Sequence, residues 1–250
     1  MNKITRRGLL SKSIGVSGSA LGLPLSEIAG AAEPQRPLKV VVAGGHPDDP
    51  ESGAGGTMAR FADLGHEVVA LYLTRGEAGV KGKSAQEAAA IRSAECEEAC
   101  KILKARPVFA GQIDGATELS PTRYEEFAKI LMSEKPDLVI THWPVDTHRD
   151  HRAASLLSFD AFLKSGRKFA LYYLEVMSGS QTQLFRPTHY VDITTTEDRK
   201  RAACFAHASQ NPKAFYEAHD LMNRFRGREH GCKFAEGFVH HNQSRGVGLP

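Results

Sequence analysis

The feature that most constrains this fold is an apolar segment, residues 38–43, that ends in two glycines and runs directly into the string HPDDPESGAGGT. A continuous apolar segment of this length is typical of a strand buried on both faces of a parallel sheet. A histidine and two aspartates directly after such a strand predict a ligand-binding loop at the edge of the sheet. A second apolar segment, residues 137–142, runs into WPVDTHRDH, so the pattern occurs twice.

Strand and helix patterns alternate along the chain, which predicts an α/β fold: one Rossmann-like domain, residues 32–250, with a doubly wound, mostly parallel sheet. Strands are expected at residues 38–43, 67–73, 108–110, 137–142, 169–176 and, at an edge, 190–193. Helices are expected to begin near Gly53, at residues 84, 120 and 152, and over 196–208 and 213–225. Ligands in such sheets bind beyond the carboxyl ends of the strands, where both polar strings are expected to lie.

The N-terminal segment is interpreted as an export signal. Residues 1–31 contain the pair Arg6 and Arg7, a short and modestly apolar stretch, and the small residues Ala29, Gly30 and Ala31. This resembles a bacterial twin-arginine signal, which predicts export to the periplasm or the exterior and cleavage near Ala31. The alternative is a short amphipathic helix that contains two arginines.

Charge and cysteine content exclude some classes of function. The net charge of +3 is carried by residues 1–31, which have four basic residues and one acidic residue, so the remainder is neutral. A neutral domain offers no electrostatic footprint for nucleic acid or anionic membrane, and no apolar segment is long enough to span a bilayer. The four cysteines form no C-x-x-C pair, which disfavours a zinc–thiolate knuckle. A disulfide between Cys204 and Cys232 would suit an exported protein, and the sequence leaves it open.

The residue types in the two polar strings indicate a divalent metal. His46 and Asp49 place a nitrogen and an oxygen ligand on one turn, which suits a borderline metal such as zinc. The second string offers further candidate ligands: His148, Asp150 and His151. A catalytic zinc site uses three protein ligands and an open position for water, and a carboxylate that is not a ligand can act as the base. Asp48 is placed for that role.

Several of these residues also have plainer interpretations. A lone His46 could be a structural histidine, and Asp48 with Asp49 could cap a helix. The glycines after them suggest a dinucleotide loop, but their spacing does not match G-x-G-x-x-G. Glu77 and Asp114 are loop acids near the expected site, where substrate contact and a turn role are both open. His142, at a strand end, is expected to support the site or pack rather than to be a fourth ligand.

Taken together, the motifs resemble the LmbE/PIG-L deacetylases. The resemblance covers residues 38–240 and rests on HPDDPESGAGGT, the TRGEAG loop, the string from Arg92 to Glu95 and the late HRDH. The family's members are metal-dependent enzymes that hydrolyse the acetamide of N-acetylglucosaminyl compounds. Lys200, Ala203, His207, Ser209 and Gln210, and the string at residues 235–238, resemble the family's C-terminal helices.

The resemblance implies a role for each site residue. His46, Asp49 and His151 would bind zinc, with iron(II) as the alternative metal, and Asp48 would be the general base. The remaining implied roles are carbonyl polarisation by His148, orientation of a histidine by Asp150, and sugar contact by Arg92. One departure stands out: the family's string is HPDDE, whereas this chain has Pro50 and then Glu51. The role of that glutamate is therefore open.

The sequence thus predicts an exported, zinc-dependent hydrolase that removes the acetyl group from an N-acetylglucosamine-type sugar or glycoconjugate. Hydrolysis of another N-acyl compound, or non-catalytic carbohydrate binding around a structural metal, are the alternatives. Substrate choice depends on loop contacts that a sequence does not display, and the oligomeric state is equally open.

Overall fold

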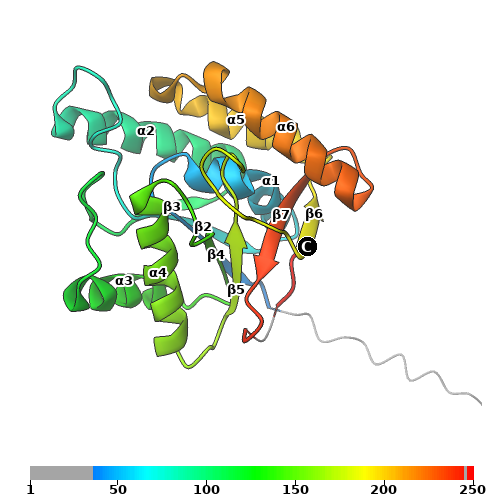
Figure 1. The fold of residues 1–250 in the computed structure, drawn as a ribbon, viewed down its shortest axis with the longest axis horizontal. Helices are drawn as coiled ribbons and strands as arrows, with labels where there is room; N and C mark the ends of the chain where they lie inside the picture. The colour runs from blue at the N-terminus through cyan, green and yellow to red at the C-terminus, as the bar shows by residue number, and fades with distance from the viewer. Residues whose placement is uncertain (1–35, 245–246) are drawn as a thin grey trace, which may run out of the picture. The chain divides into compact units, whose positions relative to one another are not determined.

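The computed structural model describes residues 36–244 and 247–250, and the predicted export signal at residues 1–31 lies outside them. Seven strands of the described region form one mixed sheet (Figure 1). They are β1 (Lys39–Gly44), β2 (Glu67–Tyr72), β3 (Arg106–Phe109), β4 (Leu138–His142), β5 (Ala170–Leu174), β6 (His189–Asp192) and β7 (Ala235–His240). Their order across the sheet is β3-β2-β1-β4-β5-β7-β6.

The order of the strands brings the two polar strings together. The first five strands across the sheet are parallel, and β7 and β6 complete it in antiparallel orientation. The chain builds β1, β2 and β3 outward in one direction, then returns to place β4 beside β1 and continues the other way. The carboxyl ends of β1 and β4 therefore meet at the topological switch point, where ligands bind in sheets of this kind. The predicted fold class is confirmed.

Helices cover both faces of the sheet. They are α1 (Asp49–Asp63), α2 (Ala85–Leu103), α3 (Pro121–Ser133), α4 (Arg149–Lys164), α5 (Glu197–Ala206) and α6 (Pro212–His230). Side chains of α1, α2 and α5 share one core, and those of α3 and α4 share the other. Strand β1 serves both: Val40 and Val42 face the first core, and Val41 and Ala43 face the second. Because alternate residues point to opposite faces, this explains the unbroken apolar run at 38–43.

Helix α1 begins four residues earlier than predicted. The glycines at 53, 55 and 56 suggested a turn, but they lie inside the helix. A Cβ on Gly53 would come within 2.8 Å of Leu174 Cδ1, and one on Gly56 within 2.6 Å of Ile193 Cγ2. These glycines therefore allow α1 to pack closely against its neighbours, and their packing overrides their low helix propensity.

Two further expectations are corrected. Helix α4 begins at Arg149 rather than residue 152, so His148 is its N-cap and Asp150 and His151 lie in its first turn. The string at residues 235–238, expected to be helical, lies in strand β7. A short strand between two antiparallel partners is set by its pairing with β5 and β6, which local sequence does not show.

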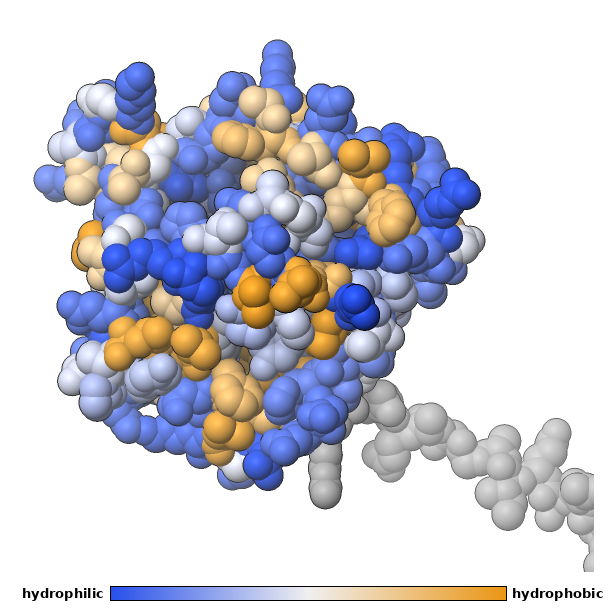
Figure 2. All heavy atoms as spheres, viewed as in Figure 1, coloured by the Kyte–Doolittle hydropathy of each residue, from blue (hydrophilic) through white to orange (hydrophobic). Residues whose placement is uncertain are grey.

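The cysteines, the helices and one face of the surface can be compared with the sequence-based expectations. All four cysteines are free, including Cys204 and Cys232, so the possible disulfide is not formed. In the described part of the chain, no helix is both long and apolar enough to cross a membrane. Figure 2 shows one face, on which apolar side chains form separate groups among polar ones.

Candidate metal and catalytic site

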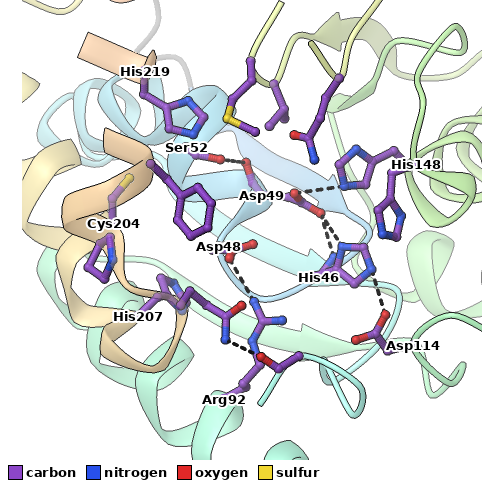
Figure 3. A pocket seen from close by; sticks show the side chains of 18 of the residues that line it. His46, Asp48, Asp49, Ser52, Arg92, Asp114, His148, Cys204, His207 and His219 are labelled. Carbon is purple, nitrogen blue, oxygen red and sulfur yellow. Dashed lines mark hydrogen bonds and ion pairs between the residues drawn. The ribbon is translucent and has the colours of Figure 1, made fainter. Parts of the chain in front are cut away.

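A pocket of about 460 Å³ lies at the switch point, where the ends of β1 and β4 meet (Figure 3). Its residues include most of the predicted site: His46, Asp48, Asp49, Arg92, Asp114, His148 and His151. Helices α5 and α6 complete it with Cys204, His207, Tyr216 and His219. Cavities of this size hold small-molecule ligands. The structure thus brings residues from 46 to 219 into one pocket.

His46 is oriented by carboxylates on both sides of its ring. Its Nδ1 lies 3.2 Å from Asp49 Oδ2, and its Nε2 lies 3.1 Å from Asp150 Oδ2 and 3.2 Å from Asp114 Oδ1. Asp150 is fully buried and is held in turn by Gly115 N at 2.8 Å and the Thr117 hydroxyl. With Nε2 directed to Asp150 and Asp114, Nδ1 is the ring nitrogen that faces Asp49 and could bind a metal.

His151 is oriented in the same manner from α4. Its Nε2 lies 3.2 Å from Asp49 Oδ1, and its Nδ1 lies 3.2 Å from Asp146 Oδ1. Asp146 also accepts hydrogen bonds from His148 N at 2.8 Å and from the Thr182 hydroxyl at 2.9 Å. A carboxylate beside the second ring nitrogen is the usual arrangement of a metal-binding histidine. Asp146 thus faces His151 Nδ1 as Asp150 faces His46 Nε2.

The donor set fits a divalent metal. Zinc with nitrogen and oxygen ligands in tetrahedral geometry requires donor atoms about 3.3 Å apart. His46 Nδ1 lies 3.2 Å from Asp49 Oδ2, and His151 Nε2 lies 3.2 Å from Asp49 Oδ1, so the two histidines face different oxygens of one carboxylate. Two groups whose donor atoms all lie within 4.8 Å of one another join His46 and His151 to His148, and Asp49 and His151 to His142. His142 stacks on His151 with ring centroids 4.0 Å apart and does not line the pocket.

The electrostatics also favour a cation here. Burial acts to lower the pKa of His46, but Asp114, Asp150 and Asp49 together raise it well above its usual value. For His151, burial is likewise overcome by Asp49 and Asp146, which raise the pKa to about 9. A cluster that draws protons onto two histidines is one in which a divalent ion can replace those protons.

Asp48 occupies the position expected of a base. It is the N-cap of α1, with a backbone φ of 110°, a conformation that residues other than glycine rarely adopt. Its Oδ2 accepts a hydrogen bond from Arg92 Nη2 at 2.9 Å, and a third of its side chain is exposed in the pocket. Burial raises the pKa of this carboxyl, and Arg92 opposes that rise. The strained backbone aims the carboxylate into the pocket beside the metal donors.

His148 is held with a free donor toward the pocket. As the N-cap of α4, it accepts a hydrogen bond at Nδ1 from Asp150 N at 3.3 Å. Burial and the neighbouring His46 lower the pKa of His148, which favours the neutral ring. A neutral imidazole that accepts at Nδ1 carries its proton on Nε2. His148 can therefore donate a hydrogen bond to an oxygen in the pocket.

The three predicted substrate contacts fall in different places. Asp114 lines the pocket and faces His46, whereas Glu77 does not line it and accepts hydrogen bonds from the backbone of Arg75 and Asp114. Arg92 lines the pocket but is 3% exposed, and it contacts Asp48 and the carbonyl of Pro47. Its contact with a sugar remains a prediction. Asp150, behind His46, does not line the pocket and has the position of an orienting residue.

The structure also answers the question of Glu51. This glutamate is fully buried, accepts a hydrogen bond from Tyr72 at 2.6 Å, and lies 3.4 Å from His207 Nε2. It therefore links α1 to the end of α5, beneath the pocket. Cys96 and Cys100 lie beside it, where the hydrogen bond with Cys100, and then burial, raise the pKa of the Cys96 thiol.

Sequence reasoning missed several pocket or supporting residues, among them Asp146, Cys204 and His219, and it interpreted Tyr216 as a core aromatic. The adjacent string WPVDTHRDH contained the signal for Asp146, because an acid five residues before His151 can reach its other ring nitrogen. Cys204, Tyr216 and His219 come from α5 and α6, where nothing in the local pattern separates a pocket residue from a core residue.

A doubly wound sheet with a histidine–carboxylate donor set at its switch point defines a class, that of α/β proteins with a candidate metal site at the carboxyl ends of their strands. The family model for PIG-L, the GlcNAc-PI de-N-acetylase, matches residues 40–162. Diacetylchitobiose deacetylase from Thermococcus kodakarensis is 31% identical over 218 residues, which are 80% of this chain and 81% of that protein. The chain belongs to the PIG-L family and is a metal-dependent N-deacetylase.

Solved structures agree on the fold. An N,N'-diacetylchitobiose deacetylase from Pyrococcus horikoshii has a TM-score of 0.72 at 28% identity, over 82% of this chain and 84% of that one. A 4-carboxy-2-hydroxymuconate hydratase from Pseudomonas putida KT2440 also has a TM-score of 0.72, at 22% identity, over 85% of this chain and 100% of that one. Since a hydratase shares the architecture, the fold alone does not determine the reaction.

Proposed function

We propose that this chain is an exported, zinc-dependent deacetylase that removes the acetyl group from an N-acetylglucosamine-type sugar or glycoconjugate. The observation that carries the proposal is the exposed Asp48 carboxylate beside the donor set of His46, Asp49 and His151, in one pocket. The relatives named for deacetylation of an acetylated sugar support the substrate class. Export rests on the paired arginines near the N-terminus.

The donor set suits zinc, with iron(II) as the alternative. His46 would bind through Nδ1, because its Nε2 faces Asp150. His151 would bind through Nε2, because its Nδ1 faces Asp146. Asp49 would supply the oxygen ligand. A divalent metal held there would polarise the acetamide carbonyl and make a water molecule more acidic.

Asp48 would act as the general base. Its burial raises the pKa of the carboxyl, which makes the carboxylate a stronger base, while Arg92 keeps it ionised and pointed into the pocket. It takes a proton from water as the water oxygen bonds to the acetamide carbon. The same carboxyl then gives that proton to the amine nitrogen as the C–N bond breaks, so the products are acetate and the free amine.

His148 would stabilise the negative charge that develops on the carbonyl oxygen. Its Nδ1 is occupied by Asp150 N, so its Nε2–H is the donor available to the pocket. Because the helix cap fixes the ring, little reorganisation is needed as the charge forms. His148 therefore donates a hydrogen bond and does not need to transfer a proton.

The test is amine release by the purified chain from a panel of N-acetylglucosamine glycosides and oligomers, after chelation and after zinc or iron(II) is restored. We expect activity to disappear with the chelator and to return with the metal. Asp49→Ala should lose both metal and activity, whereas Asp63→Ala, an exposed aspartate at the other end of the same helix, should keep both. Full metal content in Asp49→Ala would overturn the ligand assignment, and activity on N-acyl compounds other than sugars would overturn the substrate class.

A further inference from the structure

One pocket histidine has no function in the mechanism above. His219 projects from α6 into the pocket, across Asp49 and Ser52 from His148 (Figure 3). It is only 6% exposed, and no side chain or backbone group of the described residues is hydrogen-bonded to it. Its Nδ1 is fully enclosed without a partner. Buried polar groups are nearly always paired, so a histidine that lines the pocket without a hydrogen-bond partner for its side chain is suited to hydrogen-bond a bound ligand.

The charge around His219 keeps its ring neutral. Burial lowers its pKa to about 4, and the buried ammonium of Lys200 acts in the same direction, against the weaker effect of Asp49. A neutral imidazole has one N–H donor and one acceptor nitrogen. It therefore matches a hydroxyl group, which can both donate and accept, better than it matches a cation or a carboxylate.

The pocket also has apolar and aromatic lining. Tyr216 lies beside His219, with ring centroids 6.5 Å apart, and Phe215, Met177 and Val176 line the same pocket as the metal donors and Asp48. A sugar ring has apolar C–H faces and a rim of hydroxyls, so aromatic surface and one neutral hydrogen-bonding group are complementary to it.

We propose that His219 and the adjoining α6 wall form a subsite for the sugar ring, in which the imidazole hydrogen-bonds one ring hydroxyl while the acetamide lies at the metal donors. The proposal rests on the proposed function, and it adds a specificity residue that the chemistry does not require. His219 moves no proton, so its contact is made in the ground state and in the transition state alike. Its loss should raise KM and leave kcat nearly unchanged.

The test combines variants of the enzyme with variants of the substrate. His219→Met removes the hydrogen bond and keeps an apolar side chain of similar length, and His219→Gln keeps a polar group. The substrates are methyl N-acetylglucosaminide and its monodeoxy analogues, each lacking one hydroxyl. For the parent sugar we expect His219→Met to raise KM about tenfold, the usual value of one hydrogen bond to a ligand, with kcat within about twofold.

The decisive result is the coupling between the two changes. One deoxy analogue should lose about tenfold in kcat/KM with the natural enzyme and almost nothing with His219→Met, because the two changes remove the same contact. With His219→Gln, the loss in kcat/KM for that deoxy analogue should lie between the loss with the natural enzyme and the loss with His219→Met. As a control on the same helix, His230→Met should behave like the natural enzyme, since His230 is exposed and does not line the pocket. Unchanged metal content and melting temperature would show that each variant is folded.

Two other outcomes have separate meanings. If the natural enzyme deacetylates the sugar but every deoxy analogue loses equally with the natural and variant enzymes, the His219 contact is wrong and the proposed function stands. If the natural enzyme releases no amine from any of these sugars but deacetylates another N-acyl compound, the proposed substrate is wrong and the subsite falls with it.

Discussion

Helix α1 lies between two buried clusters of charge that differ in how they are neutralised. At its first turn, Asp49 meets His46 and His151 beside an open pocket. Further along, Glu236 of β7 accepts hydrogen bonds from Gly56 N at 2.9 Å, from Thr57 N at 2.8 Å, and from the ammonium of Lys200 at 2.7 Å. The second cluster is a closed ion pair whose carboxylate is satisfied on both oxygens.

The difference separates binding from structure. Around the pocket, polar atoms remain without partners, among them His142 Nδ1, Arg92 Nε and Glu51 Oε2. Around Glu236 the charges cancel within the protein, and Lys200 and Glu236 are almost wholly buried. A cluster whose charges cancel holds elements together, whereas one that raises the pKa of two histidines beside an open pocket is suited to a ligand. Substitutions in the pocket cluster should therefore lower activity more than stability, and substitutions around Glu236 should lower stability more than activity.

The largest effect is expected for Asp48→Asn. Loss of a positioned general base should lower kcat by about 10²–10⁴-fold. The metal donors remain, so metal content should be unchanged. Asn tolerates a positive φ and keeps an oxygen that can accept from the buried Arg92, so the free energy of unfolding should fall by less than in the Lys200 variant below. Steady-state kinetics, metal analysis and thermal melting test this together. A variant with normal kcat would remove Asp48 from the reaction, and one without metal would make Asp48 a ligand.

In the closed cluster, Lys200→Met should act on stability. Removing one partner leaves the Glu236 carboxylate buried without its counter-ion, which should destabilise the fold by about 3–5 kcal/mol. For a domain of this size, that corresponds to a fall in melting temperature of roughly 10 °C. Denaturant unfolding measures the free energy, and kcat per folded molecule should stay close to that of the natural enzyme.

The double variant Lys200→Met with Glu236→Gln provides the control. It removes both charges and keeps an amide oxygen that can accept from the α1 backbone. We expect it to recover more than half of the lost stability, since buried ion pairs contribute little beyond cancelling their own desolvation. A double variant no more stable than Lys200→Met would show that packing, and not the unpaired charge, accounts for the loss.

The smallest effect is expected at an exposed ion pair. Asp137, before β4, accepts hydrogen bonds from Lys39 N at 2.8 Å and from Arg36. Burial acts to raise its pKa, but these donors lower it in the fold. A carboxyl with a lowered pKa stabilises the fold above its unfolded pKa of about 4, and this contribution is lost as the pH falls. The difference in unfolding free energy between the natural chain and Asp137→Asn should therefore be constant above about pH 5 and shrink in acid. A difference that grew in acid would contradict the sign.

The sequence predicted the parallel sheet because its signals are local. Residues 40–43 and 138–140 are apolar throughout, and a strand covered on both faces is what favours such a pattern. The start of α1 was predicted four residues late and strand β7 was mispredicted, because tertiary contacts help to set both. Leu174 and Ile193 leave no room for a Cβ at Gly53 and Gly56, so the helix requires glycine there, and residues 235–240 are extended because β5 and β6 lie on either side.

The candidate site divides in the same way. His46, Asp49 and His151 could be predicted because each follows a strand that ends at the same edge of the sheet. His219 could not, since it comes from α6 and reaches the pocket only through the packing of α6 over α5 and β7. Glu77 lies in a loop near the pocket, but its carboxylate accepts hydrogen bonds from the backbone of its own loop, at Arg75, and of the loop after β3, at Asp114.

The close packing of α1 has a consequence for how this protein tolerates mutation. Asp49 and the crowded glycines belong to one rigid helix, so any side chain added at Gly56 pushes against Ile193 and shifts the ligand at the other end. In a comprehensive substitution library, Gly53 and Gly56 should be as intolerant as the metal ligands, although neither lines the pocket. Selection for activity would thus also restrict substitutions at two core glycines that do not contact the substrate.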